Sequence, residues 1–259
     1  MARFRVGVQL HPQATTIDEL RAAWRAADAL GVDSIWLWDH FYPLYGEPSG
    51  AHFECYTLLS AMAVETEHAD IGALVTCNSY RNPDLLADMA RTIDHLSDGR
   101  FVLGIGSGWF ERDYDEYGYE FGTAGDRLRH VRRNLPRIKA RLPRLNPPPV
   151  REHVPILIGG GGERVTLRIV ADYADIWHGF GTPDVVRHKL AVLDEWCRQT
   201  GRDPDDIERS VTTRGPDPVP TAKEMIEVGA TFLVSSGSGP EYDLRGLAQL
   251  VALRDSVNG

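Results

Sequence analysis

Nearly continuous apolar runs alternate with segments of helical periodicity along most of the chain. Each run is short, and most are rich in the β-branched residues valine and isoleucine. Runs of this kind are typical of parallel strands that are covered on both faces. They predict strands over Val6–Leu10, Ser34–Asp39, Ile71–Cys77, Phe101–Ile105, Pro155–Ile158, Asp175–Phe180, Glu208–Thr213 and Thr231–Ser235.

Between the runs, apolar residues recur at the i, i+3, i+4 spacing of amphipathic helices. Pro83 and Pro183 suit the first turn of a helix, and Gly31 follows the first helical stripe. The stripes are Ile17, Leu20, Trp24 and Ala27; Leu85, Met89, Ile93 and Leu96; Val186, Leu190, Leu193 and Cys197; and Leu244, Leu247 and Val251.

Eight strand–helix alternations in 259 residues predict a (β/α)8 TIM barrel, an α/β fold that commonly takes roughly 250 residues. The alternative is an open doubly wound sheet, which for a dinucleotide would carry G-x-G-x-x-G after the first strand. The first strand leads instead into Gln9-Leu10-His11-Pro12. We therefore expect one domain over residues 1–259, with an irregular excursion at 110–153 that could form a lid.

Charge and composition limit the classes of binding partner that we expect for this protein. The formal net charge is −9 and the pI about 5.5, which disfavours nucleic acid as a partner. The chain lacks an apolar run of the roughly 18 residues that a membrane span needs. Its start lacks an apolar leader, and its three cysteines are scattered. We expect a cytoplasmic protein that acts on a small molecule and binds neither nucleic acid nor membranes.

A run of four glycines, Gly159–Gly162, follows the fifth predicted strand and precedes a helical segment. In a barrel of this type, ligands bind where the strands end. Glycines let backbone N–H groups approach an anion, and a helix N-terminus favours negative charge. The run predicts a phosphate site, although a tight turn without a ligand is the alternative.

Other strand ends carry groups suited to acid–base chemistry or to a flat ligand. Asp39 and His40 follow the second strand as a carboxylate and an imidazole that titrates near neutral pH. The alternative is an exposed polar loop. The run Gly104–Trp109 only partly matches a dinucleotide fingerprint, so close approach to a ring and a crowded barrel corner stay equally open. His178 ends the sixth strand, and Arg214 follows the seventh.

Several enzyme classes are disfavoured by absent patterns. The sequence holds no H-E-x-x-H or C-x-x-C metal motif, no G-x-S-x-G elbow and no P-loop. We therefore expect no metal site. The segment Arg127–Arg144 is rich in arginine. It predicts an amphipathic helix with a solvated basic side, or alternatively a basic surface that binds an anionic ligand tail.

Six segments together resemble the bacterial luciferase-like monooxygenase superfamily. Their residues are most similar to those of the branch that uses the deazaflavin coenzyme F420. The resemblance covers roughly residues 5–200 and is specific in combination. The segments are Ser34–Phe41, Ile71–Pro83, Leu96–Trp109, Glu116–Phe121, Pro155–Glu163 and Ala171–Trp177.

The resemblance implies an F420-dependent oxidoreductase that transfers a hydride between the deazaflavin and a small organic substrate. It implies that Asp39 and His40 face the ring, with His40 giving or taking a proton. A non-prolyl cis peptide at Leu74–Val75 is implied under the ring. The further implied cofactor contacts are Thr76, Asn78, Gly108, Trp109 and His178, with Gly159, Gly160, Gly161, Gly162, Glu163 and Arg164 around the phosphate.

Two differences from the family limit which of its properties can be expected of this chain. Trp109 stands where related sugar-phosphate dehydrogenases place a catalytic glutamate, and Glu111 is the nearby substitute. The segments 110–153 and 213–220 are shorter than is usual, so the substrate is not implied. An FMN-dependent monooxygenase and a cofactor-binding barrel without turnover stay as alternatives, and a homodimer is the family expectation.

Overall fold

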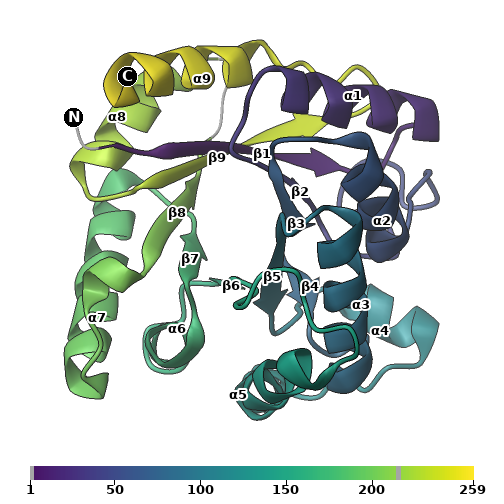
Figure 1. Ribbon diagram of the computed structural model, residues 1–259, viewed down its shortest axis with the longest axis vertical. Coiled ribbons are helices and arrows are strands. Elements are labelled where there is room, and N and C mark those ends of the chain that lie inside the picture. The colour runs from purple at the N-terminus through teal and green to yellow at the C-terminus, as the bar shows by residue number, and fades with distance from the viewer. Residues whose placement is uncertain (1–2, 214–216) are drawn as a thin grey trace.

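A closed parallel sheet surrounded by helices forms the molecule (Figure 1). The structure is a computed structural model that describes residues 3–213 and 217–259. Arg214, named above at a strand end, lies outside the described residues. The strands are β1 Arg5–His11, β2 Ser34–Leu37, β3 Asp70–Ala73, β4 Thr76–Cys77, β5 Phe101–Gly106, β6 Ile156–Gly159, β7 Ile176–Gly179, β8 Glu208–Thr212 and β9 Phe232–Ser238.

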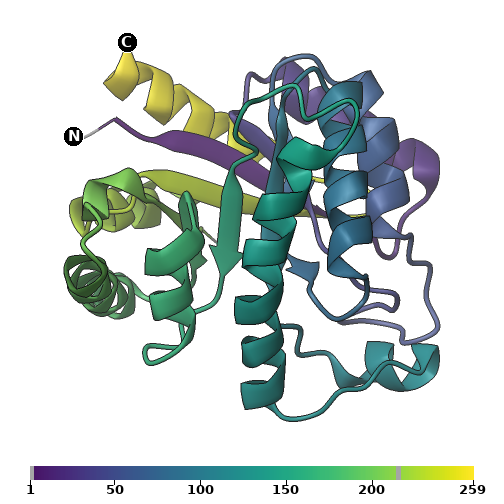
Figure 2. The ribbon, with the colours of Figure 1, turned by 60° about the horizontal axis from the view of Figure 1, so that its bottom comes forward.

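Helices follow the strands and cover the outside of the barrel (Figures 1 and 2). Short 3-10 turns occupy Leu142–Arg144 and Pro204–Asp206. The α-helices are α1 Ile17–Ala29, α2 Cys55–Glu65, α3 Pro83–Leu96, α4 Glu111–Tyr117, α5 Ala124–Arg141, α6 Thr166–Tyr173, α7 Pro183–Thr200, α8 Val219–Glu227 and α9 Arg245–Asn258.

The strand order shows that the sheet closes on itself. It runs β3-β2-β1-β9-β8-β7-β6-β5-β4, and β3 also pairs with β5. All of these pairings are parallel. Both β3 and β4 pair with β5, so together they fill one strand position of the barrel, here called a stave. The barrel therefore has eight staves. The predicted (β/α)8 barrel is confirmed, and the open doubly wound sheet is excluded.

The strand predicted over Ile71–Cys77 is wrong in its continuity. The structure divides it into β3 and β4, and the cis peptide Leu74–Val75 lies in the gap between them. β3 pairs with the start of β5, through Ile71 and Phe101, whereas β4 pairs with the end of β5. An apolar run predicts burial but does not reveal where residues leave the ladder. The cis bond itself was implied by the family resemblance, and the structure has it.

Local sequence signals explain where the helices begin. Thr16 and Glu19 form a capping box at the start of α1. Asn82 caps α3, and Thr182 caps α7. Pro83 and Pro183 follow these caps in the first turn, as predicted from the sequence.

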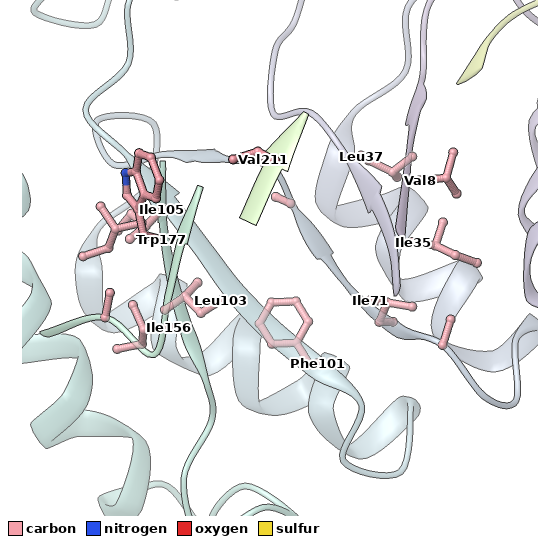
Figure 3. Packing of buried hydrophobic residues seen from close by; sticks show 14 of the residues in the cluster. Val8, Ile35, Leu37, Ile71, Phe101, Leu103, Ile105, Ile156, Trp177 and Val211 are labelled. Atoms are coloured by element: carbon pink, nitrogen blue, oxygen red, sulfur yellow. The ribbon is translucent and has the colours of Figure 1, made fainter. Parts of the chain in front are cut away.

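Apolar side chains pack on both sides of the strands. The larger cluster lies between the sheet and the helices and includes Ile35, Phe101 and Ile156 (Figure 3). A smaller cluster fills the barrel interior and includes Trp36, Leu157 and Phe232. Side chains on alternate faces of each strand thus build two cores, which fix the strand ends that carry the site.

The segment 110–153 contributes a regular part of the barrel as well as part of the mouth. α5 is the helix that connects β5 to β6, and it packs beside α3, where Arg137 pairs with Asp84. Buried Arg127 donates to the carbonyl oxygens of Gly108 and Phe121. The excursion expected from the sequence therefore contains the barrel helix α5. Among the described residues, no helix combines the length and apolarity needed to cross a bilayer.

Candidate active site

A cavity of about 880 Å³ opens at the carboxyl ends of the strands. Every stave of the barrel contributes residues to its wall, in the place where this fold carries its chemistry. Ten residues predicted from the sequence line it: Asp39, His40, Leu74, Val75, Thr76, Gly108, Trp109, Gly159, Gly160 and His178.

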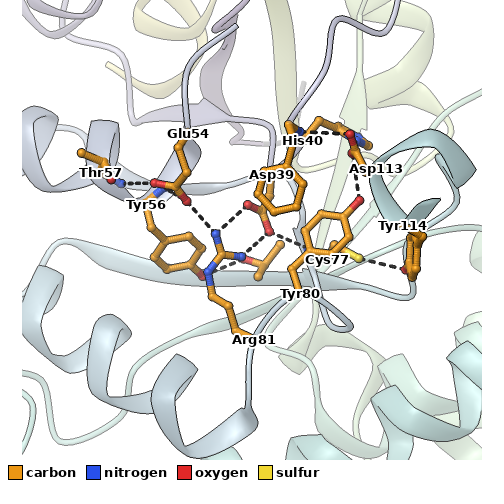
Figure 4. Close-up of polar contacts among 12 residues, drawn as sticks. Asp39, His40, Glu54, Tyr56, Thr57, Cys77, Tyr80, Arg81, Asp113 and Tyr114 are labelled. Carbon is orange, nitrogen blue, oxygen red and sulfur yellow. Dashed lines mark hydrogen bonds and ion pairs between the residues drawn. The ribbon is translucent and has the colours of Figure 1, made fainter. Parts of the chain in front are cut away.

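His40 is held by Asp113, a buried carboxylate on α4. Nδ1 of His40 lies 2.7 Å from Oδ2 of Asp113, and that oxygen also accepts the hydroxyl of Tyr80 at 2.9 Å (Figure 4). Oδ1 accepts the amides of Phe41 and Tyr42, each at 3.2 Å. A carboxylate that accepts four hydrogen bonds leaves Nδ1 as the donor, so Nε2 is the ring nitrogen available to a ligand.

A cluster of phenols and a thiol surrounds this pair. Burial, with added effects from Cys77 and Asp113, raises the pKa of Tyr80, so Tyr80 stays a neutral donor. Tyr114 Oη lies 3.1 Å from Sγ of Cys77. Burial raises the pKa of the Cys77 thiol to about 11, so this thiol stays protonated near neutral pH and is a poor nucleophile.

Asp39 was expected to face the cofactor ring, and in the structure its carboxylate binds Arg81. Its carboxylate is fully buried and forms a two-point ion pair with Arg81, at 2.6 and 2.9 Å, and accepts the Cys77 amide at 2.9 Å. Arg81 also pairs with Glu54 at 2.7 Å, the residue that caps α2. Burial alone would lower the pKa of Arg81, but attraction to Asp39 outweighs it and raises that pKa. Asp39 therefore fixes the end of β4, whereas its neighbour His40 is bonded through Nδ1 to Asp113.

The Leu74–Val75 bulge occupies the floor of the cavity. The Gln9 amide donates to the carbonyl oxygen of Leu74 at 2.6 Å and so holds the bulge from β1. A Cβ at Gly106 would lie 2.6 Å from Val75, and one at Gly159 would lie 2.9 Å from it. These two glycines make room for the Val75 side chain. This crowding is one of the two alternatives left open for Gly104–Trp109, and close approach of the run to a ring stays a prediction.

The glycine run divides into two parts. Gly159 and Gly160 line the cavity, whereas Gly161, Gly162, Glu163 and Arg164 are absent from its described wall. In the described hydrogen-bond pattern, the amides of Gly161 and Gly162 donate to no protein acceptor. Glu163 pairs with Lys189 at 2.5 Å, on the outer side of this loop.

Two predicted polar contacts have protein partners. The Asn78 side chain accepts from Asn134 at 3.1 Å and lies outside the described cavity wall, and its contact with the ring edge stays a prediction. The Thr76 hydroxyl is bonded to Tyr56 Oη at 2.8 Å. The sequence could not reveal these pairings because each partner comes from a distant helix.

His178 lines the cavity as a neutral imidazole. Its two ring nitrogens lie 2.9 Å from Ser210 Oγ and 3.1 Å from Thr212 Oγ1. Burial lowers the pKa of His178 to about 3. This side chain therefore contributes hydrogen bonding without charge at neutral pH.

The most important residue that the sequence interpretation missed is Asp113. It lies in the segment 110–153, 73 positions after His40, and no local motif marks it. Its signal was an acidic residue in a short helix that directly follows a barrel strand. No group of three or more His, Cys, Asp or Glu residues in the described ranges could hold a metal ion.

A sequence profile of the luciferase-like monooxygenase family matches residues 1–214. The chain belongs to this family. It is 32% identical over 114 residues to an F420-dependent glucose-6-phosphate dehydrogenase of Amycolatopsis mediterranei, an alignment that covers 44% of the chain and 34% of that enzyme. It is 28% identical over 254 residues to a phthiodiolone/phenolphthiodiolone dimycocerosates ketoreductase of Mycobacterium tuberculosis, with 82% and 66% coverage.

Solved structures share the fold of this family member at low identity. An F420-dependent secondary alcohol dehydrogenase with an F420–acetone adduct superposes with a TM-score of 0.83 and 14% identity, covering 97% and 98% of the two chains. The oxygenating component of a Pseudomonas putida diketocamphane monooxygenase, with FMN, gives 0.66 and 18%, covering 88% and 72%. The chain spans about a third of the glucose-6-phosphate dehydrogenase and just under two thirds of the ketoreductase.

Proposed function

We propose that this chain is an oxidoreductase that uses coenzyme F420 to transfer a hydride to or from a small organic substrate. The observation that carries the proposal is the His40–Asp113 pair in the wall of the mouth cavity, because it presents an acid–base group beside a site large enough for cofactor and substrate. The F420-dependent dehydrogenase among the sequence relatives supports the choice of cofactor.

The residues present fit a flat, phosphate-bearing cofactor. The Leu74–Val75 bulge would support the ring, and Gly108 and Trp109 would flank it. The amides of Gly161 and Gly162 face no protein acceptor in the described pattern, which suits a phosphate near the start of α6. When bound, the deazaflavin supplies or accepts the hydride, and the protein positions it.

His40 gives or takes a proton at Nε2. Asp113 keeps the imidazole in one tautomer and one orientation, because four donors fix its own carboxylate. The rings of Trp109 and Phe110 form T-shaped contacts with the His40 ring, with centroids 5.8 and 5.6 Å from it. Cys77 takes no part as a nucleophile, since its thiol stays protonated.

The alternative is an FMN-dependent monooxygenase on the same scaffold. The FMN complex among the structural neighbours favours this alternative. A barrel that binds cofactor without turnover is the third possibility. The sequence-derived expectations of a homodimer, a cytoplasmic location, and no binding to nucleic acid or membranes stay predictions.

Titration of the purified protein with oxidised F420 and, separately, with FMN tests the proposal. We expect F420 to bind at least tenfold more tightly than FMN. The phosphate-free deazaflavin precursor of F420 is the matched ligand, and it should bind more weakly by the contribution of the glycine run. Tighter binding of FMN would replace the proposal with the monooxygenase, and binding of neither would overturn both.

A glycine variant separates phosphate recognition from ring recognition. Gly161→Asp places a carboxylate in the glycine run, near the expected phosphate. It should weaken F420 binding at least tenfold and leave the affinity of the phosphate-free precursor within twofold. Equal losses for both ligands would mean that the glycine run does not hold the phosphate.

A further inference from the structure

A buried arginine contacts one wall of the cavity from behind. Arg127, near the start of α5, is 8% exposed and is absent from the described cavity wall. Its Nε donates to the carbonyl oxygen of Gly108 at 3.1 Å, and Gly108 lines the cavity. Nη1 donates to the carbonyl oxygens of Phe121 and Gly122 at 3.0 and 3.1 Å. The backbone of Gly108 therefore lies between this positive charge and the space that a ligand would occupy.

Arg127 has no carboxylate partner among the described residues, since it takes part in none of their ion pairs. Residues 1–2 and 214–216 contain no acidic side chain, so they cannot supply one. The guanidinium carbon lies 3.9 Å from the centroid of the Phe121 ring, a contact that adds attraction but no negative charge. Arginine is seldom buried without an opposite charge. Arg127 therefore leaves an uncompensated positive charge beside the cavity.

The ionisable groups that pack around Gly108 do not cancel this charge. Tyr114 Oη and Cys77 Sγ are the atoms nearest to a Cβ built at Gly108. Burial raises the pKa of the Cys77 thiol to about 11, so the thiol stays neutral. Burial also raises the pKa of Tyr114, and the positive charge of Arg127 offsets part of that rise. The field of Arg127 therefore acts on the cavity side of this wall.

Carboxylates near the cavity and on α5 have partners of their own. Asp113 accepts four hydrogen bonds, one of them from His40. Burial lowers the pKa of His178 to about 3, so its imidazole stays neutral. The remaining carboxylates form ion pairs, which are Asp39 with Arg81, Asp243 with Arg245 and Asp126 with Arg129.

A buried charge acts strongly on a ligand beside it, because the surroundings are weakly polarisable and salt screens it little. An opposite charge nearby favours the ionised form of a titrating group. The deazaflavin ring of F420 carries such a group, a hydroxyl conjugated with the ring carbonyls. Its ionisation near neutral pH gives an anion that is delocalised over the ring. The FMN ring lacks this hydroxyl and stays neutral.

We propose that Arg127 makes the cavity select the anionic form of the deazaflavin ring. The ring hydroxyl releases its proton to solvent, and the negative charge that remains is attracted to Arg127 across the backbone of Gly108. Arg127 acts through space on a ring that it does not touch, so it determines which ring binds and takes no part in the chemistry. This inference rests on the proposed function.

The absorption spectrum of a bound deazaflavin tests the inference, because loss of the hydroxyl proton moves the absorption to longer wavelength. The probe is the phosphate-free precursor of F420, so a phosphate cannot be the anion that Arg127 attracts. Its absorbance is titrated with pH, free and on saturated protein. We expect the pKa of the ring hydroxyl to fall by about half a unit or more on binding. An unchanged or raised pKa would overturn the inference.

Three variants test whether the charge of Arg127 causes the shift. Arg127→Gln keeps a donor for the carbonyl oxygens and removes the charge, so it should abolish most of the shift. Arg127→Lys keeps the charge and should keep the shift. Arg132→Met removes an equal charge from an exposed position on the same helix and should also keep it. A full shift in Arg127→Gln would overturn the inference, and so would its loss in Arg132→Met.

Riboflavin separates the charge of Arg127 from a structural role, because its ring is neutral and it has no phosphate. Near neutral pH, Arg127→Gln should weaken binding of the precursor by about threefold or more, which corresponds to half a pKa unit, and leave riboflavin within about twofold. Equal losses for both ligands would mean that Arg127 only holds the shape of the wall. A wild type that binds no deazaflavin would overturn the proposed function and this inference with it. Binding with an unshifted pKa would overturn the inference alone.

Discussion

Nδ1 of His40 lies 2.7 Å from Oδ2 of Asp113, although 73 positions separate the two residues in the chain. Both side chains are buried, and Asp113 is fully so. The relationship couples the end of β2 to α4 across the mouth of the barrel. It also gives the imidazole a defined tautomer, which a histidine facing only solvent would lack.

Replacement of Asp113 tests this coupling directly. In the wild type, we expect ¹⁵N NMR to show that Nδ1 of His40 carries a proton, which it shares with Asp113. Asp113→Asn should give a mixture of tautomers, and it should slow hydride transfer by about 100-fold or more, the usual scale of general acid–base catalysis. Asp115→Asn, at an exposed position on the same helix, is the control. A tautomer unchanged in Asp113→Asn would contradict the assigned role.

The Asp39–Arg81 pair should matter for stability more than for proton transfer. Arg81→Met leaves a buried carboxylate without its cation, which typically costs about 3–5 kcal/mol in the free energy of unfolding. The double variant with Asp39→Asn should recover part of that loss, because it removes the unpaired charge. Urea denaturation measures both, with the exposed Arg141→Met as the control. A single variant as stable as the wild type would show that the pair is dispensable.

Gly106 should tolerate no side chain while Val75 is present. A Cβ at this position would lie 2.6 Å from Cγ2 of Val75, so Gly106→Ala should cost about 1–3 kcal/mol, as overpacking usually does. Val75→Ala in the same chain should restore much of the loss. Gly161→Ala, whose Cβ would meet only the Lys189 side chain at 3.6 Å, should be close to neutral. Thermal unfolding compares the wild type, Gly106→Ala, Val75→Ala, the double variant and Gly161→Ala, and additive effects of the two changes at 75 and 106 would refute direct contact.

The sequence predicts the fold well and the site only in part, for a physical reason. Strand positions follow from local apolar runs, so the predicted strands match the observed ones within one to three residues except at Ile71–Cys77. His40 was chosen for its place at a strand end, and it lines the cavity because the barrel brings those ends together. Asp113 and Arg81 were missed because their partners are set by packing between distant elements. The contact of Asn78 with a ring stays a prediction, and its pairing with Asn134 could not be read from the sequence.

His178 should make the protein sensitive to moderate acid. Its pKa is about 3 in the folded state and near 6.5 when unfolded, so the unfolded chain binds the proton first as the pH falls. Stability is therefore full above about pH 6.5 and is lost progressively toward pH 3. From pH 6.5 to pH 5 this one group should remove about 2 kcal/mol. His52 acts in the same direction, since its pKa is also lowered, to about 4.

Urea denaturation at pH 7.5, 6.5, 5.5 and 5.0 measures how steeply the free energy of unfolding changes with pH. His178→Gln, which retains hydrogen-bonding atoms for Ser210 and Thr212 and cannot titrate, should show a shallower slope than the wild type. Identical slopes for the two proteins would mean that His178 is not kept neutral by its burial.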